Sequence, residues 1–528
     1  MGIVLAPYSF NLQGGYPDGM GGFTTIPPLP PSGDWQLPAA NYITSKLAGR
    51  IISPRPDVET DANSKLAYYR YNHSEMDYKV RICVKGMAWP FQYSIITAPA
   101  GTTIGAELDR AVDGATGKTV HTWGADYAVV TWTSPTAGTE TFTIRVTDQE
   151  GTTLDITWTT TQDDTKFVFV DSVGGSDAAA GTFAAPLETF QNGLWEGSDT
   201  ANTFVGKQAV FRAGNYPIWT TAIPSSPILD LTYKPIVYRS FNDEAVTFGT
   251  DTGHFRTSGG SALDASFIGI LCDGSRTDIA NNRIFNMQSI NGRHVFWGVD
   301  FDNMDVGTSG ADNPTCIGFY DNATKREDVA IVDCSISSTV NMQLSVTFSV
   351  DGCLVENNTL DGVVIASSNG GYGIHPKDDT SNLTVRANTV IGSVYQGCVE
   401  VSNQNTAGQP QIQYQEVCWN TLKNTDERTL KWNASSTTPD GLDSYDYRNT
   451  VISTTDTAFR FSEYSTPTPV NLSADAYYGF LGFSQGTNYT DVAPLAQAFI
   501  VTDFDVNAKL TGTARTTYLG TKGAEVAS

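Results

Sequence analysis

A six-residue motif recurs through the second half of the chain and constrains the fold more than any other feature. Each copy reads apolar residue, two variable residues, asparagine, threonine, apolar residue. The four clearest copies are Val355–Leu360, Val385–Val390, Val417–Leu422 and Asp446–Val451, the last of which begins with aspartate. Two degenerate copies precede them: Val299–Met304, with Asp302 at the asparagine position, and Ile331–Ile336, with Cys334 there. Such a repeat has to be explained before any single motif is interpreted.

The spacing of the motif indicates a solenoid. Positions 302, 334, 358, 388, 420 and 449 are separated by 32, 24, 30, 32 and 29 residues, which fits coils joined by loops of unequal length. No 3.6-residue periodicity lies between the motifs, which argues against helical repeats. The asparagine amides are expected to stack from coil to coil and to bond the neighbouring backbone, with the flanking apolar residues pointing inward. The sequence therefore predicts an all-β fold, with a right-handed parallel β-helix over residues 167–470 and a closing segment over 471–528.

Two regions of different composition precede the repeats. Residues 1–60 are rich in proline and glycine, with Pro27, Pro28, Pro30 and Pro31 close together. This region is predicted to be an irregular arm or attachment segment, and a disordered tail is the alternative. Residues 76–162 contain short runs of alternating apolar and polar residues separated by turn residues, which predicts a β-sandwich.

Charge and cysteine usage exclude several classes of partner. The formal net charge of -24 would repel nucleic acid and anionic membranes. No run of about 18 apolar residues is present, so no membrane insertion is expected. The N-terminus lacks the pattern of a secretory signal, which predicts release by another route or earlier removal of a signal. The seven cysteines show no metal-binding spacing and are expected to be reduced and buried, so no metal site and no required cofactor are predicted.

Several segments resemble known families. Phe167–Ser172, residues 174–194 and Gln208–Tyr216 are similar to the opening of pectate-lyase-like β-helices, and residues 507–512 and 520–524 to the segment that closes many of them. Residues 90–105 and 142–158 resemble cadherin-like and immunoglobulin-like (Ig-like) modules of microbial surface proteins. The β-helix resemblance spans roughly residues 167–526. It implies the fold but no single activity, because lyases, hydrolases, epimerases and non-catalytic phage spikes share that fold.

One candidate site follows from the strand after each motif. In Val399–Val401, Leu430–Trp432 and Phe459–Phe461 the apolar flanks are expected to face the core, which leaves Glu400, Lys431 and Arg460 pointing outward. His375 heads the same column if Ile374 takes the place of Val399. Lys431 and Arg460 can then hold a glycan carboxylate or sulfate while Glu400 acts as acid or base. A surface ladder of opposite charges without catalytic function is the alternative.

The neighbouring loop supplies the second candidate. Asp378 and Asp379 follow His375 directly and can join Glu400 in the carboxylate set of a hydrolase. They would alternatively bind Ca²⁺ if the protein is a lyase, or they form a plain aspartate-rich turn. Trp419 is a candidate platform for sugar stacking, whereas Trp432 is expected in the core.

Three features together favour a bacteriophage tailspike-like receptor-binding protein of the virion tail: no secretory signal, an irregular N-terminal arm, and a long β-helix with a closing C-terminal segment. Such a protein would bind and depolymerise a bacterial surface polysaccharide, attach to phage tail or baseplate proteins through the N-terminal arm, and form a homotrimer. Cleavage would be hydrolysis by a carboxylate pair, or β-elimination with Lys431 or Arg460 helping to remove a uronic acid proton. Two alternatives stay open: a secreted bacterial polysaccharide lyase or hydrolase of the same fold, and a non-catalytic glycan-binding adhesin or structural virion protein.

Overall fold

The computed structural model consists almost entirely of strands. It describes residues 16–17, 23–24 and most of residues 47–463, with gaps at 57–67, 190–206 and in many of the loops between strands. Four short elements lie outside the two main bodies: β1 (Tyr16–Pro17) pairs with β2 (Phe23–Thr24), and β8 (Val112–Asp113) pairs with β9 (Lys118–Thr119). No helix among the described residues is long and apolar enough to cross a membrane.

The region before the repeats forms two four-stranded sheets. The first has the order β3 (Arg50–Ser53), β5 (Tyr78–Lys85), β10 (Ala125–Trp132), β7 (Thr102–Leu108). The second has the order β4 (Tyr71–Asn72), β12 (Thr153–Gln162), β11 (Thr139–Thr147), β6 (Gln92–Thr97). Alternating residues bury a common core between them, in which Phe142 stacks on Trp158 with ring centroids 5.2 Å apart. Membership of this sandwich in a cadherin-like or Ig-like family stays a prediction.

The sandwich begins earlier than predicted. Strands β3 and β4 both precede residue 76, and Ile51 pairs with Val84 at the edge of the first sheet. Residues 50–53 therefore belong to the sandwich and not to the arm predicted over residues 1–60. The signal was missed because the four residues RIIS between Gly49 and Pro54 are too few to show alternation.

The repeats form a parallel β-helix that starts after a 3₁₀ turn, η2 (Asp164–Lys166). The first strands of successive coils are β13 (Phe167–Val170), β14 (Gln208–Phe211), β17 (Val237–Ser240), β20 (Ala265–Asp273), β22 (His294–Asp302), β24 (Arg326–Val332), β27 (Val350–Glu356), β30 (Ser381–Arg386), β33 (Gln413–Cys418) and β36 (Tyr445–Tyr447). The second strands are β15 (Gly214–Pro217), β18 (Val246–Gly249), β25 (Ser335–Ser337), β28 (Thr359–Ile365), β31 (Thr389–Val394), β34 (Thr421–Asn424) and β37 (Thr450–Ser453), whereas β20 and β22 run through both positions.

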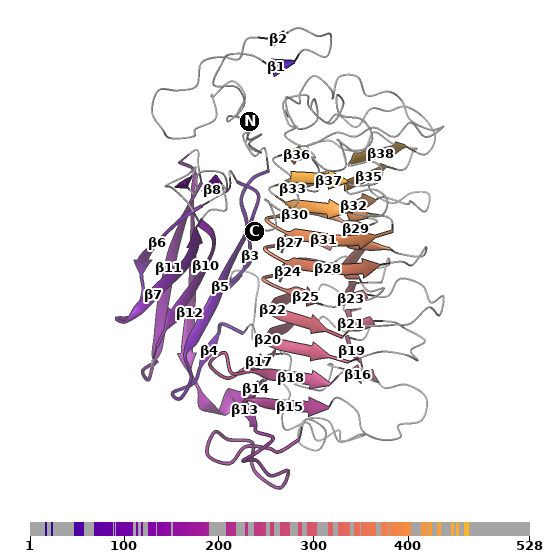
Figure 1. Ribbon diagram of the computed structural model, residues 1–528. Coiled ribbons are helices and arrows are strands. Elements are labelled where there is room, and N and C mark those ends of the chain that lie inside the picture. The colour runs from indigo at the N-terminus through magenta and orange to yellow at the C-terminus, as the bar shows by residue number, and fades with distance from the viewer. Residues whose placement is uncertain are drawn as a thin grey trace.

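A separate nine-stranded sheet holds the third strand of each coil. It contains β16 (Ile228–Asp230), β19 (His254–Thr257), β21 (Arg283–Met287), β23 (Thr315–Phe319), β26 (Gln343–Phe348), β29 (Tyr372–Lys377), β32 (Gly397–Ser402), β35 (Leu430–Ala434) and β38 (Phe459–Glu463). Every pairing between coils among the described strands is parallel, as in β27–β30, β28–β31 and β29–β32. Figure 1 shows the coils stacked along one axis. The predicted parallel architecture is thus confirmed by the strand pairings.

The predicted asparagine ladder is present and buried. The Asn358 amide donates to the carbonyl of Ile331 (3.0 Å) and to Asn388 Oδ1 (2.8 Å). Asn388 repeats both bonds one coil further on, to the carbonyl of Val355 and to Asn420 Oδ1. Each asparagine of the ladder thus bonds backbone groups of the turn that would otherwise be buried without a partner. Asn449 lies outside the described residues.

The ladder position in the earlier coil was predicted wrongly. Trp297 pairs with Val332 and Asp300 with Ser335, so the residue equivalent to Cys334 is Val299 and not Asp302. The turn there is made by Gly298, whose φ of 60° matches the 56° of Asp333 before Cys334. The six-residue pattern was aligned three residues too late because no asparagine marks this coil. Asp302 instead points outward, beside Ser337.

Breaking the ladder should destabilise the whole stack. Asn388→Ala removes the acceptor of the Asn358 backbone N–H and amide, and it leaves the Val355 carbonyl without its donor. We expect a loss of about 3 kcal/mol in the free energy of unfolding, since buried polar groups lose their partners. Urea unfolding measures it, with the exposed Asn215→Ala as the control that should leave the midpoint unchanged. Equal, small effects of both substitutions would contradict a stabilising ladder.

Aromatic rings and thiols fill the interior of the β-helix. Tyr238, Phe267 and Phe296 stack in consecutive coils, with ring centroids 5.3 Å apart at each step. All seven cysteines are buried, as predicted. The core is therefore built from inward side chains that meet their equivalents in the next coil.

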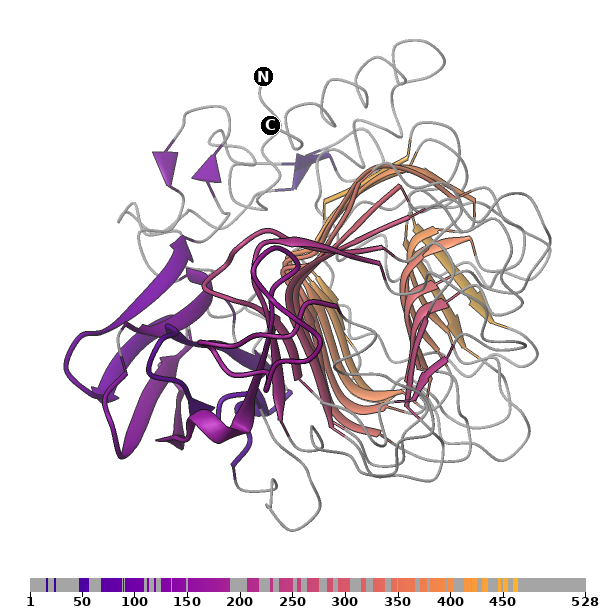
Figure 2. The same cartoon turned by 90° about the horizontal axis from the view of Figure 1, so that it is seen from below.

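The sandwich packs along the flank of the β-helix. Outward residues of the first strands, among them Ile268, Val332 and Leu354, form one apolar cluster with sandwich residues. Figures 1 and 2 show the sandwich lying beside the stack of coils rather than beyond its end. The sandwich thus covers part of the outer face of the first strands.

Candidate functional site

The predicted charged column has the predicted register. Glu400 pairs with Lys431, and Lys431 with Arg460, on consecutive third strands. Ile374 pairs with Val399, which puts His375 next to Glu400 in the same column. The alignment that gives Ile374 the place of Val399 is therefore correct.

The exposure of this column differs from the prediction. Val399 and Val401 lie in the core, so Glu400 faces away from it, yet Glu400 is 0% and His375 2% exposed. The ring of His375 packs against Tyr372, with centroids 4.1 Å apart. Alternation along a strand predicts which way a side chain points but not what covers that side. Glu400 and His375 thus do not lie on the open surface that was expected.

The other predicted site residues are only partly described. Lys431 and Arg460 are placed by their strands, but their side chains lie outside the described part of the structure. Asp378, Asp379 and Trp419 also lie outside the described residues.

The ends of the Asp378–Asp379 loop are firmly anchored. Strand β29 ends at Lys377, directly after Pro376, which has no N–H to donate to a neighbouring strand. The hydroxyl of Thr380 lies within hydrogen-bonding distance of the carbonyls of Thr347 (2.9 Å) and Lys377 (2.8 Å), which share its single proton. Gln415 in turn donates its side-chain amide to the carbonyl of Thr380. A buried threonine therefore closes the base of this loop.

Three aspartates that the sequence did not reveal as a group lie together on the outer side of the second strands, here called the second-strand flank. Val299 and Phe301 of β22 point into the core. Asp300, between them, and Asp302, directly after Phe301, therefore point outward. Asp273 of β20 pairs with Asp302 in the adjacent coil. Alternate residues of a strand are about 6.7 Å apart and adjacent strands about 4.8 Å. The alternation of Val299 to Asp302 would have revealed this pair, had Asp302 not been assigned to the ladder.

Hydroxyl and amide groups hold these carboxylates in place. Ser335 donates its hydroxyl to Asp300, and Ser337 donates to Asp302 Oδ1 (3.0 Å). Asn303 donates its amide to Asp273 Oδ1 (2.8 Å) and its backbone N–H to Asp302 (2.9 Å). Each carboxylate is thus oriented by a neighbour one coil away or next in the chain.

Asp300 differs from an ordinary exposed aspartate. Partial burial of its carboxyl raises the pKa of Asp300, and the hydrogen bonds from Ser335 oppose that rise. The residue as a whole remains exposed, so a ligand can reach it. A carboxyl that keeps its proton to higher pH, beside a second carboxylate, has the properties of an acid–base pair.

The arrangement does not suggest a metal site. Among the described residues, no group of three His, Cys, Asp or Glu side chains is placed so that it could hold a metal ion. Asp273, Asp300 and Asp302 therefore share one flank without converging on one point. The expectation of Ca²⁺ at Asp378 and Asp379 lies outside the described residues.

Comparisons with known proteins give only distant structural similarities. No family model and no curated protein matches the chain. The native and selenomethionine structures of GH136 lacto-N-biosidase from Eubacterium ramulus are similar at 10% identity, with TM-scores of 0.28 and 0.29, over 59% of this chain. The chain spans 65% of the length of each of those structures.

A third similar structure is the Family 28 exopolygalacturonase of Yersinia enterocolitica. It is 10% identical, with a TM-score of 0.29, over 77% of this chain and 97% of the other. Similarities this low carry no argument about activity. The description of this chain as a parallel β-helix rests on its own strand pairings.

Proposed function

We propose that the chain binds and hydrolyses a bacterial surface polysaccharide on its second-strand flank, with Asp300 and Asp302 as the catalytic pair. The observation that carries this proposal is the outward pair of aspartates on β22, in which Asp300 has a raised pKa. Hydrolysis of a glycosidic bond needs one protonated and one ionised carboxyl group. An exposed flank of a long solenoid also offers a polymer several coils of contact.

The spacing of the two aspartates favours direct attack by water. Inverting glycosidases hold their carboxyl groups about 6.5–9.5 Å apart, and the α-carbons of alternate strand residues, about 6.7 Å apart, are compatible with that separation. Asp300 would donate its proton to the leaving oxygen, and Asp302 would remove a proton from the attacking water. Asp273, one coil away, would bind sugar hydroxyls beside Asp302. The product would have the opposite anomeric configuration to the substrate.

The biological setting is part of the same proposal. The chain would act as a tailspike-like protein of a phage virion tail, attached to tail or baseplate proteins through residues 1–60 and assembled as a homotrimer. A secreted bacterial enzyme of the same fold is the alternative setting, and both settings require the same chemistry. The support is the combination, predicted from the sequence, of an irregular N-terminal arm, no secretory signal and a long β-helix with a closing segment.

Cleavage can be tested without knowing the host. The purified full chain is incubated with a panel of bacterial capsular polysaccharides and lipopolysaccharides, and product size is followed by size-exclusion chromatography and mass spectrometry. We expect one member of the panel to be reduced to short oligosaccharides. Binding with unchanged polymer mass would show a non-catalytic adhesin and would overturn the enzymatic proposal.

The column of Glu400, Lys431 and Arg460 supports a second candidate, β-elimination of a uronic acid polymer. Its specific support is the register that places an acid and two bases on consecutive coils. Elimination would give an unsaturated product that absorbs in the ultraviolet, whereas hydrolysis would not. His375, Asp378, Asp379 and Trp419 would belong to this second site.

Glu400→Gln separates the two candidates. Because Glu400 is fully buried, we expect the substitution to change turnover less than about tenfold, whereas loss of a true general acid or base costs about 10²–10⁴-fold. Steady-state rates on the cleaved polysaccharide provide the measurement, with the unfolding midpoint as the control for folding. A loss of several hundredfold at unchanged stability would move the active site to the third-strand flank.

A further inference from the structure

Strand β5 of the sandwich crosses six coils of the β-helix. At its start, the backbone N–H of Asp77 donates to Asn242 in the turn after β17 (2.9 Å), and Lys79 forms an ion pair with Asp243. At its end, Lys85 bonds Asn382, and the N–H of Gly86 donates to Thr384 of β30 (3.1 Å). The first strands between these contacts pair in the order β17, β20, β22, β24, β27, β30. One segment of the sandwich therefore touches both ends of a long stretch of the stack.

The lengths of the two elements agree. Five steps between coils at about 4.8 Å give about 24 Å along the stack. Nine steps of extended chain, from residue 77 to residue 86, reach at most about 30 Å. The strand can thus follow the stack with a moderate tilt and without a break, as Figure 1 shows for β5 beside β20 to β27.

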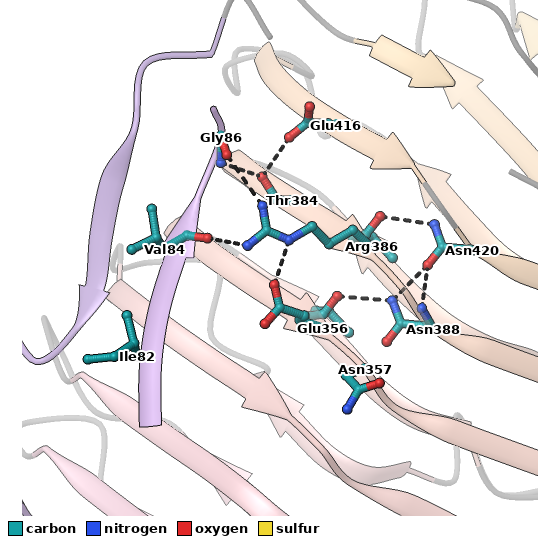
Figure 3. Close-up of polar contacts among 12 residues, drawn as sticks. Ile82, Val84, Gly86, Glu356, Asn357, Thr384, Arg386, Asn388, Glu416 and Asn420 are labelled. Atoms are coloured by element: carbon teal, nitrogen blue, oxygen red, sulfur yellow. Dashed lines mark hydrogen bonds and ion pairs between the residues drawn. The ribbon is translucent and has the colours of Figure 1, made fainter. Parts of the chain in front are cut away.

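Buried charges fix the middle of this contact. The guanidinium of Arg81 on β5 bonds Asp333 (2.8 Å) and Glu356 (2.7 Å), which belong to successive coils. Glu356 also accepts from Arg386 of the next coil, and Arg386 donates to the carbonyls of Val84 and Gly86 on the sandwich (Figure 3). Arg81 is 0% exposed, and Glu356 and Arg386 are 1% exposed. Glu356 is thus bonded from both bodies at once.

A second contact repeats the pattern at the edge strand. Arg50 of β3 bonds Asp328 (2.9 Å) and Asp351 (3.0 Å), again in successive coils. A Cβ at Gly352 would lie 2.7 Å from the Arg50 guanidinium carbon, so the coil leaves room for this side chain. Two neighbouring strands of the sandwich therefore link the same coils.

We propose that β5 is an axial brace that makes coils β17 to β30 open as one unit. In an isolated solenoid each coil contacts only its neighbours, so opening can start at an end and spread coil by coil. A rigid strand that is bonded to the first, middle and last coils of a stretch opposes this, because no single coil can leave without the loss of sandwich contacts. The brace is independent of whether the β-helix cleaves a glycan.

Hydrogen exchange of the full chain tests the brace through coils that the substituted residue does not touch. In the wild type we expect the amides of β20, β27 and β30 to exchange at one common slow limit. Arg81→Met should make the amides of β30 exchange at least about tenfold faster than those of β17 and β20, because local opening then becomes separable from global opening. Arg145→Met, at an exposed ion pair of the other sheet, is the matched control and should change nothing.

Two exchange patterns would overturn the proposal. Faster exchange confined to β24 and β27, the coils that Arg81 contacts, would show a local contact only and overturn the proposal. Equal acceleration in all coils would overturn it as well. If Arg81→Met fails to fold, the double variant Lys85→Met/Thr384→Val removes the bonds from Lys85 to Asn382 and from Gly86 to Thr384, and so weakens the contact with the last coil. In that variant exchange in β30 must rise while β17 stays unchanged, and unchanged exchange throughout would refute the brace.

Discussion

Asp302→Asn and Asp300→Asn are each expected to lower turnover on the cleaved polysaccharide by about 10²–10⁴-fold, the usual loss when a general acid or base is removed. Both side chains point outward from β22, so neither substitution creates a cavity or leaves a buried charge without a partner. The unfolding midpoint should therefore stay unchanged. Steady-state rates and a thermal melt of each variant provide the measurement.

The neighbouring carboxylate Asp361 supplies the matched control. Asp361 is exposed on the same flank. It pairs with Ser337, which in turn pairs with Asp302, so Asp361 lies two coils from Asp302. Asp361→Asn should keep turnover within a few-fold of wild type. If it lowers turnover as strongly as Asp302→Asn, the flank acts through its overall charge and the assignment of a pair at β22 is wrong.

The two catalytic variants should also differ in their pH profiles. Burial raises the pKa of Asp300, so in the wild type the rate should fall as rising pH removes the proton from this group. Asp300→Asn should abolish that limb of the profile together with most of the rate. Asp302→Asn should retain it on a much lower rate.

Glu356→Gln is expected to destabilise the protein by about 3–5 kcal/mol, the usual effect of removing one partner from a buried ion pair. Glu356 lies between Arg81 and Arg386, with Oε1 2.7 Å from Arg81 and Oε2 2.5 Å from Arg386. Glutamine keeps the shape but removes the charge, so two buried guanidinium groups lose a shared anion. Urea unfolding followed by tryptophan fluorescence measures the loss.

An exposed ion pair provides the comparison for Glu356. Arg145 and Asp155 form a two-bond ion pair on the open face of the sandwich, where solvent screens it. Asp155→Asn should leave the unfolding midpoint unchanged. Comparable effects of the two substitutions would mean that water reaches Glu356 and that the buried network contributes little.

The sequence was informative wherever a residue meets its own equivalent in the next coil. Asn358, Asn388 and Asn420 could be aligned because an amide ladder needs asparagine in every coil. The pairing of Glu400 with Lys431 followed from the same spacing. In the coil of Asp302 no asparagine stands at the ladder position and glycine makes the turn. The alignment was therefore wrong by three residues, and the outward pair Asp300 and Asp302 was not recognised.

Contacts between distant parts of the chain could not be predicted in this way. Arg81 and Glu356 are separated by 275 residues, and nothing local to either segment shows that they meet. The burial of Glu400 is a similar case, because periodicity gives the direction of a side chain and not its cover. Docking of the sandwich along the coils was missed for the same reason.

Cleavage in water enriched in heavy oxygen tests the central claim most directly. Hydrolysis at Asp300 and Asp302 requires each cut to place one oxygen atom from water on the new reducing end. The account predicts product oligosaccharides that carry one heavy oxygen each, with no unsaturated, ultraviolet-absorbing sugar. Unlabelled unsaturated products, or a polymer that is bound but never shortened, would contradict it.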